Sequence, residues 1–170
     1  APQAGRELLG REDVDDVHTL LAQEAKKRAV DWEWHNGLTD KCQLPATLVR
    51  QVLINLVLNA VQAAGEQGRV SARVTLTAGV LHIEVGNSGS RIPPALMEHL
   101  FEPFTGSKET GQGLGLWITY QIVQQLHGHI DVVVPFPDDR FLVLVPHTGR
   151  AGALQAAGRM CARIREHPGI

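Results

Sequence analysis

Four amide side chains recur along one apolar stretch of the sequence, QVLINLVLNAVQAA, residues 51–64. Gln51, Asn55, Asn59 and Gln62 have the spacing i, i+4, i+8 and i+11, so on a helix they form one narrow polar stripe. A buried amide without a hydrogen-bond partner costs a few kcal/mol, so something must satisfy these groups. A ligand pocket would do so, and so would the edges of neighbouring strands; the helix alone does not decide between them.

A glycine-rich segment favours the pocket. TGQGLGLWITYQIVQQL, residues 110–126, places Gly111, Gly113 and Gly115 before and at the start of an amphipathic helix. Glycines there let backbone N–H groups approach a ligand closely, and a helix N-terminus favours an anion. A flexible loop with a helix cap is the alternative. No strand precedes the segment and GK[ST] is missing, so it is neither a Rossmann fingerprint nor a P-loop.

The segment between them, VGNSGSRIPPALMEHLFEPFTGSK at residues 85–108, runs from a strand through a Gly/Pro turn into a loop flanked by aromatic residues. In this order the three segments resemble the four boxes of the GHKL ATPases, in particular the catalytic ATP-binding domain of bacterial sensor histidine kinases. QVLINLVLNAVQA resembles the N box, NSGSRIPP the G1 box, LFEPF with Phe101 and Phe104 the F box, and GQGLGL the G2 box. The resemblance covers about residues 13–146.

The resemblance implies ATP and Mg²⁺ as cofactors. It implies that Asn59 ligates the Mg²⁺ bridging the ATP phosphates, and a neutral oxygen suits that hard cation. Asn55 would be the second catalytic residue, at the position where hydrolysing relatives have a glutamate base. An amide cannot take that proton at neutral pH, so we expect a phosphoryl donor and not a vigorous ATP hydrolase. The residues implied to bind the nucleotide, under a lid of residues 88–113, are Asn55, Asn59, Gln62, Asn87, Gly89, Ile92, Phe104, Lys108, Gly111, Gln112, Gly113, Leu114, Gly115 and Leu116.

The G1 box departs from the family form, which is close to DNGPGIP. Asn87 stands where the family has an aspartate that binds the adenine amino group. It keeps a carbonyl acceptor but loses the charge, which should weaken adenine recognition by about 1 kcal/mol. Arg91 adds bulk at a glycine position, where it would swing outward, narrow the site or reach a phosphate. Lys108 is equally compatible with a phosphate contact and with a solvated loop.

Three histidines invite other interpretations. His127 and His129 form HGH, a conceivable metal pair, but a turn is the favoured reading. His18 in DDVHTLLAQ does not match the phosphoacceptor form H-E-x-x-x-P. We therefore expect the acceptor helices to belong to another part of the parent protein.

Composition agrees with a soluble, nucleic-acid-independent domain. The chain has 170 residues, 44% hydrophobic and 20% charged, with a net charge of −2, and this charge argues against nucleic acid as a partner. Cys42 and Cys161 stand apart without a CxxC motif, which argues against a zinc site and for a reducing compartment, with a single bridge between the two as the alternative. We expect a cytoplasmic domain, whether or not the parent protein carries a membrane anchor.

Hydrophobic periodicity predicts helices at 13–29, 46–64 and 114–127, a short helix at 93–101, and a polar loop at 36–45. Predicted strands are 30–35, 69–79, 80–87, 129–135 and 140–146. The predicted fold is α+β: a two-layer sandwich (Bergerat fold) with a mixed, mostly antiparallel sheet of about five strands, covered on one face by three helices. Residues 1–12 would lead in, 13–147 would form the ATP-binding domain, and 148–170 would be a basic tail with a helical pattern.

The expected function is donation of the ATP γ-phosphoryl to a histidine on a separate dimerisation domain, which then serves a response regulator. This chain would be monomeric and its parent kinase a homodimer. A second interpretation is a degenerate GHKL domain that acts as a regulatory protein-interaction module, which Asn87 and Arg91 would support. A third, an ATP-driven machine of the mismatch-repair or chaperone type, is disfavoured by Asn55.

Overall fold

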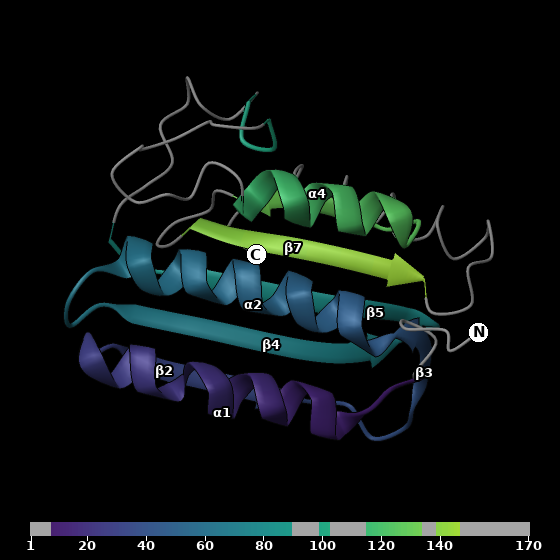
Figure 1. Cartoon of the computed structure of the whole chain (residues 1–170), viewed down its shortest axis with the longest axis horizontal. Coiled ribbons are helices and arrows are strands. Elements are labelled where there is room, and N and C mark those ends of the chain that lie inside the picture. Colours follow the sequence, from purple (N-terminus) through teal and green to yellow (C-terminus); the bar gives the residue numbers. More distant parts are fainter. Residues whose placement is uncertain (1–7, 90–98, 103–114, 134–138, 147–170) are drawn as a thin grey trace.

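The computed structural model describes residues 8–89, 99–102, 115–133 and 139–146 of the chain. Within them, three helices lie on one face of a five-stranded sheet, and a small two-stranded sheet lies at one end (Figure 1). The helices are α1 (Arg11–Lys27), α2 (Ala46–Ala64) and α4 (Gly115–Gln125). The strands are β1 (Leu8–Leu9), β2 (Asp31–Asn36), β3 (Cys42–Pro45), β4 (Arg69–Thr77), β5 (Val80–Asn87), β6 (His129–Val133) and β7 (Asp139–Pro146).

The large sheet has the strand order β2-β4-β5-β7-β6. β2 and β4 are parallel, and the other neighbours are antiparallel. The predicted two-layer α+β sandwich, with a mixed sheet and three helices on one face, is confirmed. Its hairpin β4–β5 closes through a turn at Ala78 and Gly79, where both residues have positive φ.

Alternation along the strands builds the core. Val70, Ala72 and Val74 of β4 are buried on the helix side, whereas Arg69 and Arg73, which alternate with them, are exposed. α2 packs on β4 and β5 and contacts both α1 and α4. By length and composition α2 is also apolar enough to cross a membrane. However, eight of its side chains are buried, so it serves here as the central core helix.

The structure differs from the sequence prediction around residues 36–45. This region is not a continuous loop, because β3 forms there and pairs antiparallel with β1. A strand as short as β1 has no periodicity to detect, and its partner CQLP carries only two buried residues, Cys42 and Leu44. The predicted short helix at 93–101 lies mostly outside the described residues.

Candidate functional site

The amide stripe of α2 becomes more buried toward the end of the helix. Gln51 is exposed, whereas Asn55, Asn59 and Gln62 are half-buried. Gln51 Nε2 donates a hydrogen bond to Asn55 Oδ1 at 2.8 Å. This bond turns the Asn55 oxygen back along the helix and leaves its NH₂ group available to an acceptor.

Asn59 lies one turn further on. Within the part of the chain that the structure describes, its side-chain amide makes no hydrogen bond. It is half-buried on an apolar helix, and its amide atoms remain accessible to solvent. The amide is therefore available to a ligand that accepts or donates at this position.

The G1-like turn lies directly against the end of α2. Gly89 has φ of +98°, a conformation that side chains rarely adopt. A Cβ added there would lie 3.1 Å from Ala63 O and 3.2 Å from Ala64 O. This close approach explains the glycine, and it brings the end of β5 to the end of α2 that carries Asn59 and Gln62.

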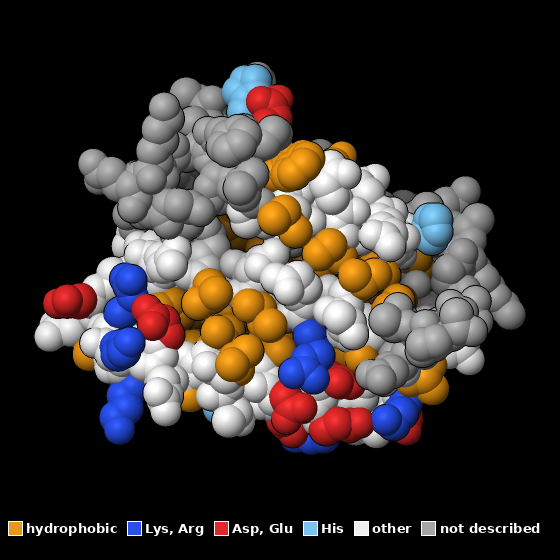
Figure 2. Space-filling model, in the orientation of Figure 1, with side chains coloured by type: hydrophobic (Ala, Val, Ile, Leu, Met, Phe, Trp, Pro, Cys, Tyr) orange, Lys and Arg blue, Asp and Glu red, His pale blue; other side chains and the backbone are white. Residues whose placement is uncertain are grey.

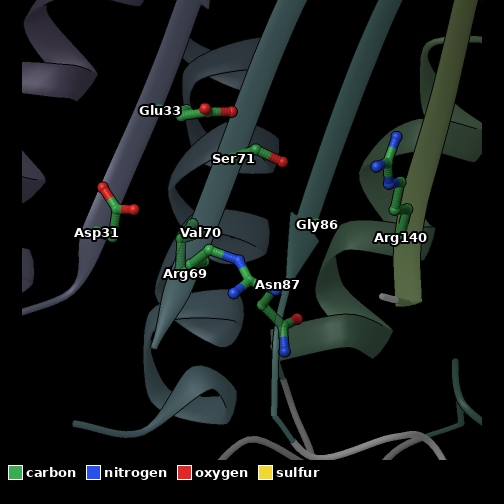
Figure 3. A pocket seen from close by; sticks show the side chains of 8 residues that line it. All are labelled: Asp31, Glu33, Arg69, Val70, Ser71, Gly86, Asn87 and Arg140. Carbon is green, nitrogen blue, oxygen red and sulfur yellow. The ribbon is translucent and has the colours of Figure 1, made fainter. Parts of the chain in front are cut away.

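Asn87 ends β5 on the helix-covered face and is only 9% exposed. Its Nδ2 donates to Ser88 O at 2.9 Å. The turn is held to β4, because Ser88 N donates to Arg69 O at 2.9 Å and Arg69 N donates to Ser88 Oγ at 2.8 Å. Figure 3 shows Asn87 at this end of the sheet, beside Arg69. Among the described residues, Asn87 Oδ1 has no hydrogen-bond partner, so the acceptor that an amino group would need is available.

The start of α4 lies near the end of α2, since the two helices lie side by side and run in opposite directions (Figure 1). Thr119, fully buried, donates through Oγ1 to Gly115 O at 2.8 Å and fixes this first turn. Leu116 is half-buried and packs against the core cluster. A Cβ at Gly115 would meet no atom within 4 Å, so steric crowding does not explain this glycine.

The structure places the predicted site residues Asn55, Asn59 and Gln62 along one stripe of α2, and the turn of Asn87 and Gly89 against the end of that helix. The helix α4, which carries Gly115 and Leu116, packs beside α2. The other predicted site residues lie outside the described residues: Ile92, Phe104, Lys108, Gly111, Gln112, Gly113 and Leu114. Arg91 lies outside them too.

The histidines have structural roles. The His18 ring centroid lies 4.8 Å from that of Trp34 and 5.3 Å from that of Trp32, so this ring joins α1 to β2 by stacking. His127 occupies the turn after α4 with φ of 58°. At Gly128 a Cβ would come within 2.8 Å of Leu144 O, which explains the glycine of HGH. The stacking of His18 has no signal in the one-dimensional sequence, because the two tryptophans come from a later strand.

Comparison with known proteins decides the family. A model of the histidine kinase-, DNA gyrase B-, and HSP90-like ATPases matches residues 45–153. The chain belongs to this family. Sensor histidine kinase ZraS of Escherichia coli O157:H7 is 34% identical over 114 residues, which is 66% of this chain and 25% of that protein. Sporulation kinase A of Bacillus subtilis (strain 168) is 37% identical over 127 residues, 70% of this chain and 20% of that protein.

Solved structures similar to this chain agree with the family assignment. The catalytic domain of histidine kinase ThkA, in a nucleotide-free form, matches with a TM-score of 0.73 and 30% identity, over 80% of this chain and 91% of that one. ThkA in complex with the response regulator protein TrrA matches with a TM-score of 0.70 and 29% identity, over 82% of this chain and 41% of that one. The chain is thus an ATPase-family catalytic domain similar to those of sensor histidine kinases. It spans about a quarter of the ZraS sequence, and the comparisons give no support to a degenerate domain.

The family implies a nucleotide, and the residues present fit one that arrives with Mg²⁺. Within the described ranges, no group of three His, Cys, Asp or Glu side chains could hold a metal by itself. The site instead offers the half-buried amide of Asn59, which has no hydrogen-bond partner among the described residues. Mg²⁺ keeps several waters and takes one or two protein oxygens together with substrate phosphates, so a single amide oxygen suits it.

Proposed function

We propose that this domain binds Mg-ATP and donates the γ-phosphoryl to a histidine on a separate dimerisation domain of the same parent protein. The observation that carries the proposal is Asn59, a half-buried amide without a partner among the described residues, on the polar stripe of the core helix. Its oxygen would ligate Mg²⁺, whose charge would offset that of the ATP phosphates. The rest of the catalysis is positioning, since phosphoryl transfer requires little covalent chemistry from the protein.

Asn55 favours transfer to another protein over hydrolysis. Its amide has no basic atom to deprotonate a water molecule. Because Gln51 holds the Asn55 oxygen, the NH₂ group faces onward along the stripe and can donate to a phosphate oxygen. Gln62, one turn beyond Asn59, would lie beside the same phosphates.

Asn87 and the predicted lid complete the site. The free Oδ1 of Asn87 would accept from the adenine amino group, while Gly89 permits the turn that starts the lid. Ile92, Phe104, Lys108 and the GQGLGL residues 111–116 would close over the nucleotide. These assignments rest on the family resemblance within the proposed domain 13–147.

The partners follow from the same resemblance. The response regulator complex of ThkA supports a regulator as the final phosphoryl acceptor. Membership among sensor kinases supports a cytoplasmic domain in a parent kinase that forms a homodimer.

The decisive experiment is a calorimetric titration of Mg-ATP into the wild-type chain and Asn59→Ala. We expect Asn59→Ala to abolish magnesium-dependent binding while the circular dichroism spectrum is unchanged. Asn55→Ala should weaken binding less. Thr47→Ala is the matched control, because Thr47 lies on the same line of α2 at its exposed start. Equal magnesium-dependent affinities of the wild type and Asn59→Ala would contradict the assignment.

Incubation with γ-labelled ATP separates donor from acceptor. We expect no stable label on this chain, because it contains no H-E-x-x-x-P motif and the His18 ring packs at a tilt against two tryptophans. Acid-labile label on the wild-type chain would show that the acceptor assignment is wrong.

A further inference from the structure

Strand β2 forms one edge of the five-stranded sheet, beside helix α1 (Figure 1). Among the described strands it pairs with β4 alone. Asp31 N donates to Gly68 O at 2.8 Å, so the main chain of Asp31 faces β4. Successive residues of a strand direct their main-chain groups to opposite sides, so the N–H and C=O groups of Trp32 and Trp34 face away from β4. Among the described residues, none of these four groups has a hydrogen-bond partner.

The two sides of this edge differ in charge. On the far face of the sheet, which is the side away from the helices, β2 presents the carboxylates of Asp31 and Glu33 (Figure 3). Both residues are exposed, and neither carboxylate has an ion-pair partner among the described residues. On the helix side, the last turn of α1 is basic and carries Lys26 and Lys27 (Figure 2). A strand added to this edge would therefore meet acidic side chains on one of its faces only.

A groove of about 440 Å³ lies between α1 and β2 on the helix side. The small side chains of Ala22, Ala25 and Ala29 line it together with Trp32. Among the described residues, none from β4 or α2 lines the groove, so it lies on the outer side of α1 and β2, next to the free edge. Alternate side chains of an added strand would point to this side, where the groove has room for an apolar one.

The strand already paired with β2 shows which side chains its neighbours can carry. β4 places Arg69 beside Asp31 on the far face and Val70 beside Trp32 on the helix side. Its sequence, RVSARVTLT, alternates polar residues, two of them arginines, with apolar ones. Opposite charges on adjacent strands stabilise their pairing. A strand on the free edge of β2 would meet the same two rows of β2 side chains, so the same alternation suits it.

We propose that the free edge of β2 binds an extended segment of a partner protein by strand addition. Basic side chains of the segment would lie beside Asp31 and Glu33, and its apolar side chains would point toward the groove of α1. The main-chain groups of Trp32 and Trp34 would supply the hydrogen bonds. β4 lies between β2 and β5, so this surface is separate from the proposed nucleotide site.

A second copy of this chain is a less favourable occupant. If two β2 strands paired antiparallel through Trp32 and Trp34, the Glu33 side chains of the two copies would lie directly opposite each other. Like charges in that position destabilise pairing. Charged side chains on an edge strand commonly prevent self-association in this way. A segment that carries arginine or lysine opposite Glu33 has no such repulsion.

Fluorescence anisotropy of a dye-labelled peptide tests the charge pattern. The probe is RVSARVTLT, the sequence of β4, and the control is VRSRAVTLT, which has the same composition but both arginines on the face that carries valine and leucine. We expect the full chain to bind the probe at least about fivefold more tightly at low salt. Failure of the probe to bind, or equal affinities for the two peptides, would overturn the proposal.

Two double variants of the protein separate a local effect from a change in net charge. Asp31→Asn with Glu33→Gln should remove the preference for the probe. Asp40→Asn with Glu66→Gln makes the same change of charge at exposed positions outside β2 and should leave the preference intact. Equal losses in the two double variants would show that the peptide does not bind at β2.

Amide hydrogen exchange measured by NMR tests the position of the peptide. In the free chain the amides of Glu33 and His35, which face β4, should exchange slowly, whereas those of Trp32 and Trp34 should exchange fast. The probe should slow Trp32 and Trp34 at least about tenfold. Slow exchange of these two amides in the free chain would overturn the proposal. If that protection increased with protein concentration, a second copy would be the occupant, and otherwise the chain itself would cover the edge.

Two variants of α1 test the groove. Ala22 is exposed and lines the groove, so Ala22→Phe should fill it and weaken binding of the probe. Gln23→Phe adds the same ring at the next exposed position, outside the groove, and should leave the affinity unchanged. Equal affinities of the two variants would show that the segment does not enter the groove. None of these measurements depends on nucleotide binding.

Discussion

The two faces of the five-stranded sheet differ in how many polar side chains they carry and in how exposed those side chains are. On the helix-covered side the core is almost entirely apolar, and among the described residues only Asn87 and Thr119 are buried polar side chains. On the far face, charged residues such as Glu33, Glu84 and Arg140 are common. An exposed polar residue on the far face, the side of the sheet away from the helices, is satisfied by water and needs no ligand to explain it. On the covered face, a missing partner alone does not mark the site, because Trp32 Nε1 and Trp34 Nε1 beside α1 are also buried without one among the described residues. Asn59 and Asn87 differ from them in lying on α2 and at the end of β5, the elements that meet at Gly89.

The largest expected difference between the two faces is in stability. Leu56 of α2 is fully buried against the sheet, so Leu56→Ala should lower the free energy of unfolding by about 2–5 kcal/mol. Glu33→Ala on the exposed part of the far face should change it by no more than about 0.5 kcal/mol. Urea unfolding followed by circular dichroism measures both. Similar losses in the two variants would show that the far face is part of a packed core in this region as well.

The variant Asn87→Asp tests whether the buried amide of Asn87, at the edge of the covered face, binds the adenine amino group. Restoring the carboxylate should tighten ATP binding about tenfold, equivalent to about 1.4 kcal/mol, although desolvation of the charge reduces the gain. GTP affinity should stay flat or fall, because guanine has a carbonyl where adenine has its amino group. Calorimetry with both nucleotides measures the preference.

The same variant has a predicted cost in stability. Aspartate cannot donate to Ser88 O, so the free energy of unfolding should fall by about 1 kcal/mol while ATP affinity rises. Unchanged ATP affinity together with an unchanged ATP-over-GTP preference would show that Asn87 does not face the base.

His82, a half-buried residue whose Nε2 atom is fully buried, should make the free energy of unfolding depend on pH. Because the pKa of His82 is lowered in the folded protein from its ordinary 6.5, the unfolded chain binds the proton more readily. Stability is then lost as the pH falls through 6.5 toward the lower folded value. Other charged or titratable groups also lie on this face: Glu84 on the same strand, Arg73 on β4, Arg140 on β7, His129 and Asp131 on β6, and Asp31, Glu33 and His35 on β2.

Urea unfolding at about pH 7.5 and about pH 5.5 measures this loss of stability. His82→Gln should reduce the difference between the two conditions. A His82→Gln variant with the wild-type pH dependence would assign the loss to other groups.

The smallest effect should come from the ion pair between Arg140 and Glu84. Its Nη1–Oε1 distance is 2.8 Å, but the two side chains are 43% and 36% exposed. Glu84→Gln should therefore cost only about 0.2–1 kcal/mol, and the cost should shrink in high salt. A loss well above this range that persists in high salt would mean that this ion pair is shielded from solvent.

The sequence was most informative where a pattern extends over many residues. The limits of α2 were predicted to the residue, because a long apolar helix is bounded by Pro45 and Gly65. The stripe of Asn55 and Asn59 followed from the same periodicity. β1 and β3 were missed, because pairing between distant short segments leaves no local pattern. The hydrogen bond from Gln51 to Asn55, and the stacking of His18, depend on side-chain conformation and could not be foreseen.

The parallel pairing of β2 with β4 has a kinetic consequence. The hairpin β4–β5 is local, whereas Asp31 pairs with Arg69 only after the chain has passed through β3 and the whole of α2. Contacts that close long loops form late in folding, since the loop-closure entropy is paid before they form. We expect the hairpin to form early and the β2–β4 crossover late. α2, which carries Asn55 and Asn59, lies within that crossover, so nucleotide binding should be among the last properties to appear during refolding.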